Sequence, residues 1–150
     1  NCHDPHGLTV KTAACSGCHT TPDPTAIRMT SVADYDGDGD VTEGIAGEIE
    51  TLAQLLYEGI VAKSTAGGAP LVYSASAYPY WFADADANGA VDEGEEGYAA
   101  WTPRLLKAAY NYQYVQKDPG AYAHNGTYIM QVLYDSIQDV GGSVTGLVRP

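Results

Sequence analysis

One short motif constrains this chain more than any other feature, the C-x-x-C-H sequence from Cys15 to His19. This spacing is the attachment signature of c-type haem. Two thiols three positions apart can each add to one vinyl group of a haem, and the next residue then offers an imidazole to the iron. The motif therefore predicts a covalent haem c held by Cys15, Cys18 and His19. Cys2 and His3 repeat its last two positions, so a second haem is predicted there.

Four histidines are available as iron ligands, and only two of them follow a cysteine. The other two are His6 and His124, and we predict that they coordinate the irons from the opposite side. Bis-histidine ligation leaves no open position on the iron, so it favours electron transfer over chemistry on a substrate. Because His3 and His6 are close along the chain, we expect His6 to reach a different haem from the one that His3 holds. The alternatives are that His6 is a turn residue and that His124 is a polar residue near a helix start.

Other chemistry stays open for the same residues. Cys2, Cys15, Cys18 and one histidine would also make a Cys3His zinc site, which would suit a non-redox surface scaffold. A thioredoxin-like redox pair fits less well, because no alternating strand and helix pattern surrounds the motif. A haem peroxidase would need an iron with an open position, which follows if His6 or His124 is not a ligand.

Two acidic segments follow the D-x-[DN]-x-[DN]-G pattern of EF-hand calcium loops, one from Asp34 and one from Asp84. Carboxylates at positions 1, 3 and 5 converge on one ion because the loop curls around it, and glycine at position 6 permits the turn. Oxygen ligands favour Ca²⁺ over transition metals. The predicted ligands are Asp34, Asp36, Asp38, Asp40 and either Glu43 or Glu48 in the first loop, and Asp84, Asp86, Asn88, Ala90 and Glu95 in the second.

The two loops differ at position 12, where an EF-hand needs a bidentate carboxylate. The second loop has Glu95 there, but the first has an isoleucine, so Glu43 and Glu48 are its two candidate closing carboxylates. Both loops carry a valine at position 8, and we expect Val41 and Val91 to pair the loops through a short antiparallel bridge. The sequence thus predicts about two structural Ca²⁺ ions. The alternative is two solvated acidic turns, since aspartate and glycine are common in turns.

Length and charge narrow the class of protein. The chain has 150 residues and a formal net charge of −12, and its length suits one domain with its own core. Binding to phosphate backbones needs a basic face, so nucleic acid is excluded as a partner. No apolar run approaches the ~18–20 residues that span a bilayer, so no transmembrane segment is expected. The acidic balance favours cationic or metal-rich partners.

Three helices are predicted, which makes the fold mainly α with extensive irregular loops. Apolar residues recur at helical spacing over residues 43–63. A second helix starts at Thr102-Pro103 and buries Leu105 and Leu106. Asn125 is the predicted N-cap of the third, which places His124 just outside that helix.

The chain divides into three parts on this interpretation. Residues 1–30 form a haem-binding arm, 31–140 a helical domain with two EF-hand-like calcium loops, and 141–150 a flexible C-terminal tail. The aromatic segment 71–82 is irregular or a short strand, and its rings are expected to pack in the core rather than to face a ligand.

The start of the chain resembles the doubled C-x-x-C-H arrangement of extracellular multihaem c-type cytochromes, on the residues Asn1 to Gly7 and Ala14 to His19. The segment from Lys117 to Asn125 is similar to the distal-histidine segment near the end of some of these proteins. The first cysteine of the first motif is absent here, which suggests a portion of a longer or polymerising chain.

This resemblance implies electron transfer without catalysis, by two or more haem c groups, some of them shared with a neighbouring chain. It implies a periplasmic or extracellular location, which covalent haem attachment also favours. The implied partners are other cytochrome subunits, including copies of the chain in a filament, and redox partners or extracellular electron acceptors.

Overall fold

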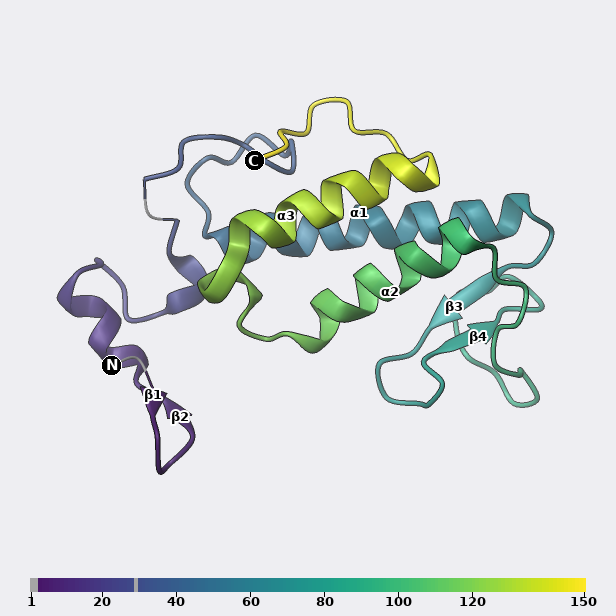
Figure 1. The fold of residues 1–150 in the computed structure, drawn as a ribbon, viewed down its shortest axis with the longest axis horizontal. Coiled ribbons are helices and arrows are strands. Elements are labelled where there is room, and N and C mark those ends of the chain that lie inside the picture. Colours follow the sequence, from purple (N-terminus) through teal and green to yellow (C-terminus); the bar gives the residue numbers. More distant parts are fainter. Residues whose placement is uncertain (1–2, 29) are drawn as a thin grey trace.

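The centre of the molecule is a bundle of three helices (Figure 1). The computed structural model describes residues 3–28 and 30–150. The helices are α1 (Ile45–Ala66), α2 (Pro103–Lys117) and α3 (Ala121–Val140), and each overlaps one of the three predicted segments. Helix α3 lies along α1, and α2 packs against both. Within the described residues, no helix combines the length and the apolar character needed to cross a membrane.

Facing apolar stripes hold α1 and α3 together. Residues three or four positions apart share one face of a helix, so each stripe points into the core. Glycine at position 59 lets the two helices approach closely, because an added Cβ would lie only 2.8 Å from Val140. The buried residues of the two stripes include Ile49, Leu52, Leu56, Ile60, Ile129, Leu133 and Ile137.

Local signals explain where the helices begin and end. The Thr102 side chain accepts a hydrogen bond from the N–H of Leu105 at 3.3 Å, and Pro103 occupies the first turn of α2. Helix α3 begins at Ala121, one turn earlier than predicted, and consists of two helical stretches that meet at Asn125, whose backbone is not helical (φ −159°, ψ 49°). Asn125 thus precedes the longer stretch, as predicted, and His124 lies in the short helical turn before it.

The prediction that Leu106 is buried was also wrong. Leu105 is 2% exposed and Leu106 is 51% exposed, because one helical step turns the second side chain out of the interface.

We expect Leu105→Ala to lower the free energy of unfolding by about 2–5 kcal/mol through the cavity it leaves. Leu106→Ala should change it by no more than about 0.5 kcal/mol. Urea unfolding followed by circular dichroism measures both. Equal losses in the two variants would mean that α2 packs through a different face.

A short antiparallel ribbon beside the bundle carries the aromatic segment. It consists of β3 (Leu71–Tyr73) and β4 (Trp81–Ala83), with Val72 opposite Phe82. Trp81 is buried, packs edge-on against Trp101 with ring centres 6.2 Å apart, and donates from Nε1 to Gln113 Oε1 at 3.2 Å. The interpretation of this segment as core packing is therefore confirmed for Trp81.

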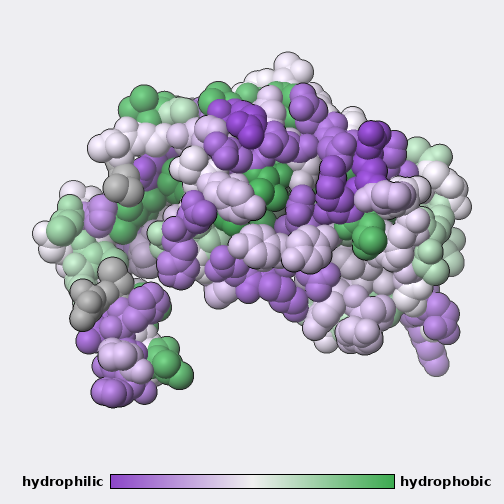
Figure 2. Space-filling view, in the orientation of Figure 1, coloured by the Kyte–Doolittle hydropathy of each residue, from purple (hydrophilic) through white to green (hydrophobic). Residues whose placement is uncertain are grey.

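The N-terminal arm leaves the bundle as a separate projection (Figures 1 and 2). It contains a hairpin of β1 (His3–Asp4) and β2 (Thr9–Val10), followed by the 3₁₀ helices η1 (Thr12–Gly17) and η2 (Pro24–Ala26). No described residue from His3 to Ile27 is buried. The arm thus has no protein core of its own.

The arm joins the bundle at the start of α1. Ile45 donates its N–H to the carbonyl of Ile27 at 3.2 Å. Gly44 lies directly against the backbone of Thr25 and Ala26, where a Cβ would collide with that backbone. The first acidic loop lies in the segment of the chain between Ile27 and the start of α1.

Residues 141–150 are predicted from the sequence to be a flexible tail, but in the structure they contact the rest of the chain. Val148 donates its N–H to the carbonyl of Tyr35 at 3.1 Å, and Arg149 pairs with Asp135 at 2.7 Å. The carbonyl of Gly146 lies 3.0 Å from where a Cβ of Gly37 would be. The end of the chain therefore packs over the first acidic loop.

The two acidic loops lie at opposite ends of α1, so the predicted pairing of Val41 with Val91 is wrong. The first loop leads directly into the start of α1. The second begins at Asp84, whose N–H donates at 3.1 Å to Pro70, just beyond the end of that helix. A helix of 22 residues is about 33 Å long, which separates the loops.

Candidate haem and cation sites

The C-x-x-C-H segment forms one tight turn. In a 3₁₀ helix, side chains three positions apart lie on the same side. Cys15 ends up half-buried and Cys18 exposed, both as free thiols. The N–H groups of Cys18 and His19 both donate to the carbonyl of Cys15, at 3.1 and 2.9 Å. The turn thus presents two accessible thiols beside an imidazole, which fits the needs of double thioether attachment.

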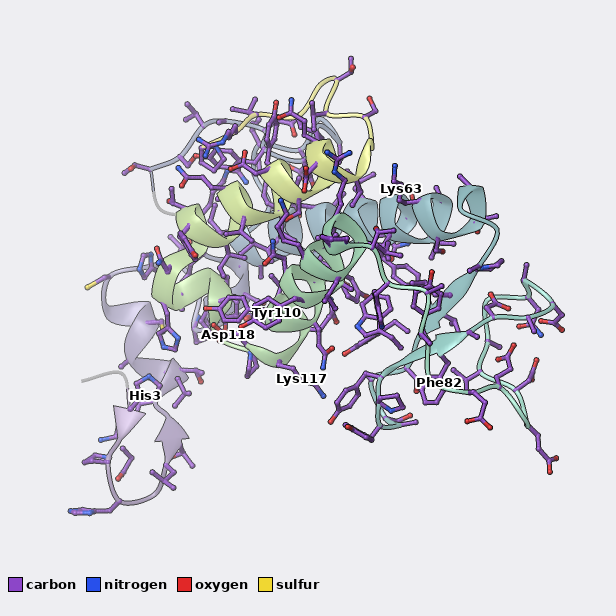
Figure 3. All side chains as sticks on the ribbon, turned by 45° about the vertical axis from the view of Figure 1, so that its right-hand side comes forward. His3, Lys63, Phe82, Tyr110, Lys117 and Asp118 are labelled. Carbon is purple, nitrogen blue, oxygen red and sulfur yellow. The ribbon has the colours of Figure 1, made fainter. Side chains whose placement is uncertain are left out.

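His3 and His124 come from opposite ends of the chain and meet where the arm faces α3. Their ring centres are 6.1 Å apart, and the ring planes differ by 29°. In Figure 3, His3 lies on the arm, and Asp118 lies on the connection that leads into the turn of His124. Because a metal–imidazole bond is about 2.0–2.1 Å long, two imidazoles on opposite sides of one metal have centres about 6 Å apart. The observed separation matches that requirement.

Gly120 makes room for the His124 ring, and sequence reasoning missed this role. A Cβ at position 120 would lie 2.7 Å from Cε1 and 2.8 Å from Nδ1 of His124. Its own N–H donates to Asp118 Oδ1 at 3.0 Å, which orders the turn before the helix. Nothing in the sequence pattern signals this close approach, because it depends on how the ring folds back.

The other predicted haem ligands are less constrained. The carboxylate of Asp4 accepts the N–H groups of His6 and Gly7, both at 2.9 Å. These hydrogen bonds, Gly7 first, lower the pKa of Asp4. The His6 side chain is exposed at the hairpin turn. Cys2 lies outside the described residues.

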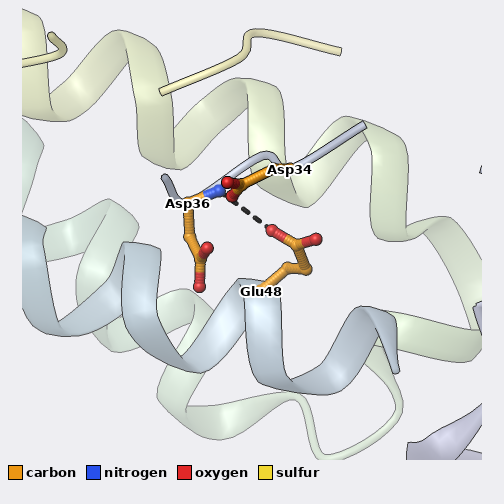
Figure 4. Close-up of side chains that lie close together, drawn as sticks. All are labelled: Asp34, Asp36 and Glu48. Carbon is orange, nitrogen blue, oxygen red and sulfur yellow. Dashed lines mark hydrogen bonds between the residues drawn. The ribbon is translucent and has the colours of Figure 1, made fainter. Parts of the chain in front are cut away.

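The first acidic loop brings its carboxylates together in two overlapping groups. Oxygens of Asp36, Asp38 and Glu43 lie within 4.8 Å of one another, and so do oxygens of Asp34, Asp36 and Glu48. Asp34 accepts the N–H groups of glycines 37 and 39, at 2.6 and 2.9 Å, which curls the loop. Figure 4 shows the second group, with the Asp36 side chain directed toward α1.

Burial and like charge raise the pKa of two of these carboxyls. The pKa of Glu43 is raised to about 7, first by burial and then by the charges of Asp36, Glu48 and their neighbours. The pKa of Asp36 is also raised, chiefly by burial, although the hydrogen bond from the N–H of Asp38 opposes the shift. Asp40 differs, because its carboxylate accepts both the N–H and the hydroxyl of Thr42, which lowers its pKa.

The second acidic loop also gathers its predicted ligands. Oxygens of Asp84, Asp86 and Glu95 lie within 4.8 Å of one another. Glu95 accepts the N–H groups of Ala85 and Asp92, at 2.7 and 2.9 Å. The remaining predicted ligands, Asn88 and Ala90, are joined to each other by an N–H to Oδ1 hydrogen bond of 2.8 Å. Calcium stays a prediction at this loop.

Comparison with known proteins identifies relatives of one kind. The chain is 32% identical over 155 residues to the C-type polyheme cytochrome OmcC of Geobacter sulfurreducens. It is 33% identical over 153 residues to the C-type polyheme cytochrome OmcB of two strains of the same organism. Each match covers 82% of this chain but only 19–20% of the relative, so the chain spans about a fifth of their length.

No family model matches the chain, and no solved structure is significantly similar to it. The chain is nevertheless related over most of its length to polyhaem c-type cytochromes. Their names describe polyhaem cytochromes, which supports the prediction, drawn from the resemblance to multihaem cytochromes, of an electron carrier rather than an enzyme.

Proposed function

We propose that this chain, a relative of polyhaem c-type cytochromes, is a haem-carrying segment through which electrons pass. The observation that carries the proposal is the pair of imidazoles of His3 and His124, with centres 6.1 Å apart. They would be the two axial ligands of one haem c, anchored at Cys2. A second haem c would be held by Cys15, Cys18 and His19.

The haem iron supplies the redox change when bound, and the chain's residues set the conditions for it. Two histidines on one iron leave no position for a substrate, which favours electron transfer. The exposed arm between His3 and Ile27 lacks buried residues, and a haem packed against it would supply the missing apolar surface. His6 remains our proposed distal ligand for a haem other than that of His3.

An absorption spectrum and an intact mass of the full chain, produced with its haem-attachment machinery, test this function. We expect a sharp reduced band near ~550 nm and a mass excess of whole haem groups. One haem would show that only the Cys15–Cys18 pair attaches covalently. A colourless protein would contradict the proposal and leave a non-redox zinc- and calcium-binding scaffold as the better account.

Location and assembly follow from the same proposal. Covalent haem attachment favours a periplasmic or extracellular protein. The relatives are much longer than this chain, and further haems on neighbouring segments or subunits would extend the electron path. We propose other cytochrome subunits as partners, including copies in a filament. Sedimentation of the haem-loaded chain as a monomer at high concentration would contradict filament formation.

A further inference from the structure

The closing carboxylate of the first acidic loop can be identified by elimination. Glu48 is fully buried, and its Oε1 lies 2.5 Å from Arg28. Its Oε2 accepts the N–H groups of Tyr35 and Asp36, at 2.8 and 2.9 Å, and Figure 4 shows the bond to Asp36. Oε2 therefore has its hydrogen bonds, while Oε1 makes an ion pair and no hydrogen bond, so the charge of Glu48 is already balanced by the guanidinium.

Asp36 belongs to both groups, so the groups differ in their glutamate: Glu48 is paired with Arg28, whereas Glu43 forms no ion pair among the described residues. Asp36 is only 4% exposed, and its Oδ2 has no hydrogen-bond partner. Oε1 of Glu43 is likewise buried and without a partner. Leaving a buried carboxylate oxygen unsatisfied is costly. Asp36, Asp38 and Glu43 each place one carboxylate oxygen within 4.8 Å of the others, so a cation bound among them would offset this cost.

Gly47 is what lets Glu43 reach this position. The carboxylate of Glu43 folds back over the first turn of α1 and occupies the place that a Cβ of residue 47 would take. Any other residue at position 47 would push the carboxylate away from Asp36 and Asp38. The chain thus uses a glycine inside a helix, where it is normally unfavourable, to hold this acidic side chain inward.

We propose that the first acidic loop binds one Ca²⁺ ion through Asp36, Asp38 and Glu43, with Glu43 replacing the missing position-12 carboxylate. Carboxylate oxygens in a flexible loop suit Ca²⁺ rather than a transition metal. The ion would sit where the loop, the start of α1 and the C-terminal segment over Gly37 meet. It would fasten the junction from which the haem-binding arm departs.

Calorimetric titration with CaCl₂ tests this site. The sample is the full haem-loaded chain, from which bound Ca²⁺ and Mg²⁺ have been removed with a chelator. The second loop is disabled by Asp86→Asn and Glu95→Gln, so that only the first loop can respond. We expect one remaining binding event, with Mg²⁺ binding at least about tenfold more weakly. Absence of a binding event, or equal binding of Mg²⁺, would overturn the proposal.

Two variants and one control, each added to the chain with the disabled second loop, locate the ion. Gly47→Ala alters no charge and favours the helix by up to about 1 kcal/mol, yet it should weaken Ca²⁺ binding about tenfold or more by displacing Glu43. Glu43→Gln should weaken it similarly, while Glu50→Gln, on the exposed side of α1, should leave it unchanged. Unchanged binding in Gly47→Ala and Glu43→Gln would exclude Glu43 as a ligand. The titration does not depend on the haem assignment.

Discussion

Replacing His124 with alanine should open one iron to external ligands without unfolding the chain. A bis-histidine iron is saturated, so the reduced wild-type protein should bind no carbon monoxide. Loss of one axial imidazole should allow about one equivalent to bind and should shift part of the oxidised spectrum from low spin to high spin. Because the His124 side chain is exposed and its ring lies against His3 and Gly120 rather than in the core, stability should change little. Carbon monoxide titration of the dithionite-reduced protein measures the effect.

Two further variants separate ligation from a general disturbance of α3. Gly120→Ala keeps the imidazole but displaces it, since the new Cβ would lie 2.7 Å from Cε1 of His124. It should give a partial opening of the same iron. Thr127→Ala, exposed in the same helix, should behave as wild type. If His124→Ala binds no carbon monoxide and its spectrum is unchanged, His124 is not a ligand, and the pairing with His3 is wrong.

The helices were predictable because their signals are local. Thr102-Pro103 is a helix start signal. The apolar spacing within 43–63 identifies the buried face of a helix without any knowledge of what packs against it. Leu106 shows what local spacing does not predict. It is apolar and adjacent to the buried Leu105, yet it points outward, because only tertiary packing decides how wide the buried stripe is.

The sequence predicts which residues are candidate ligands but not which of them lie close together. Sequence motifs select His3 and His124 as ligand candidates, but their proximity depends on how the arm folds against α3. In the same way, Glu43 and Glu48 are equivalent candidates along the chain. The position of Arg28 separates them, because it neutralises only Glu48. Arg28 carries no motif and could not have been recognised before the fold was known.

Replacing Arg28 with methionine should have the largest effect on stability of any single change considered. Its side chain is 7% exposed and that of Glu48 is not exposed at all. Removing one member of a buried ion pair leaves the other charge uncompensated and typically costs about 3–5 kcal/mol. Arg28 also donates to the carbonyls of Ser31 and Glu43, at 3.3 and 3.2 Å, and to that of Ala33. The loss of these bonds adds to the cost.

Urea unfolding in the presence of EDTA measures this loss without a contribution from bound calcium. The matched control is Arg149→Met, which breaks an exposed pair with Asp135 and should cost less than about 1 kcal/mol. Adding Glu48→Gln to Arg28→Met should recover part of the stability, because glutamine keeps an oxygen acceptor for the N–H groups of Tyr35 and Asp36 but carries no charge. If Arg28→Met costs no more than Arg149→Met, the buried charge of Glu48 is balanced by something other than Arg28. The reasoning that leaves Glu43 as the free closing carboxylate would then lose its basis.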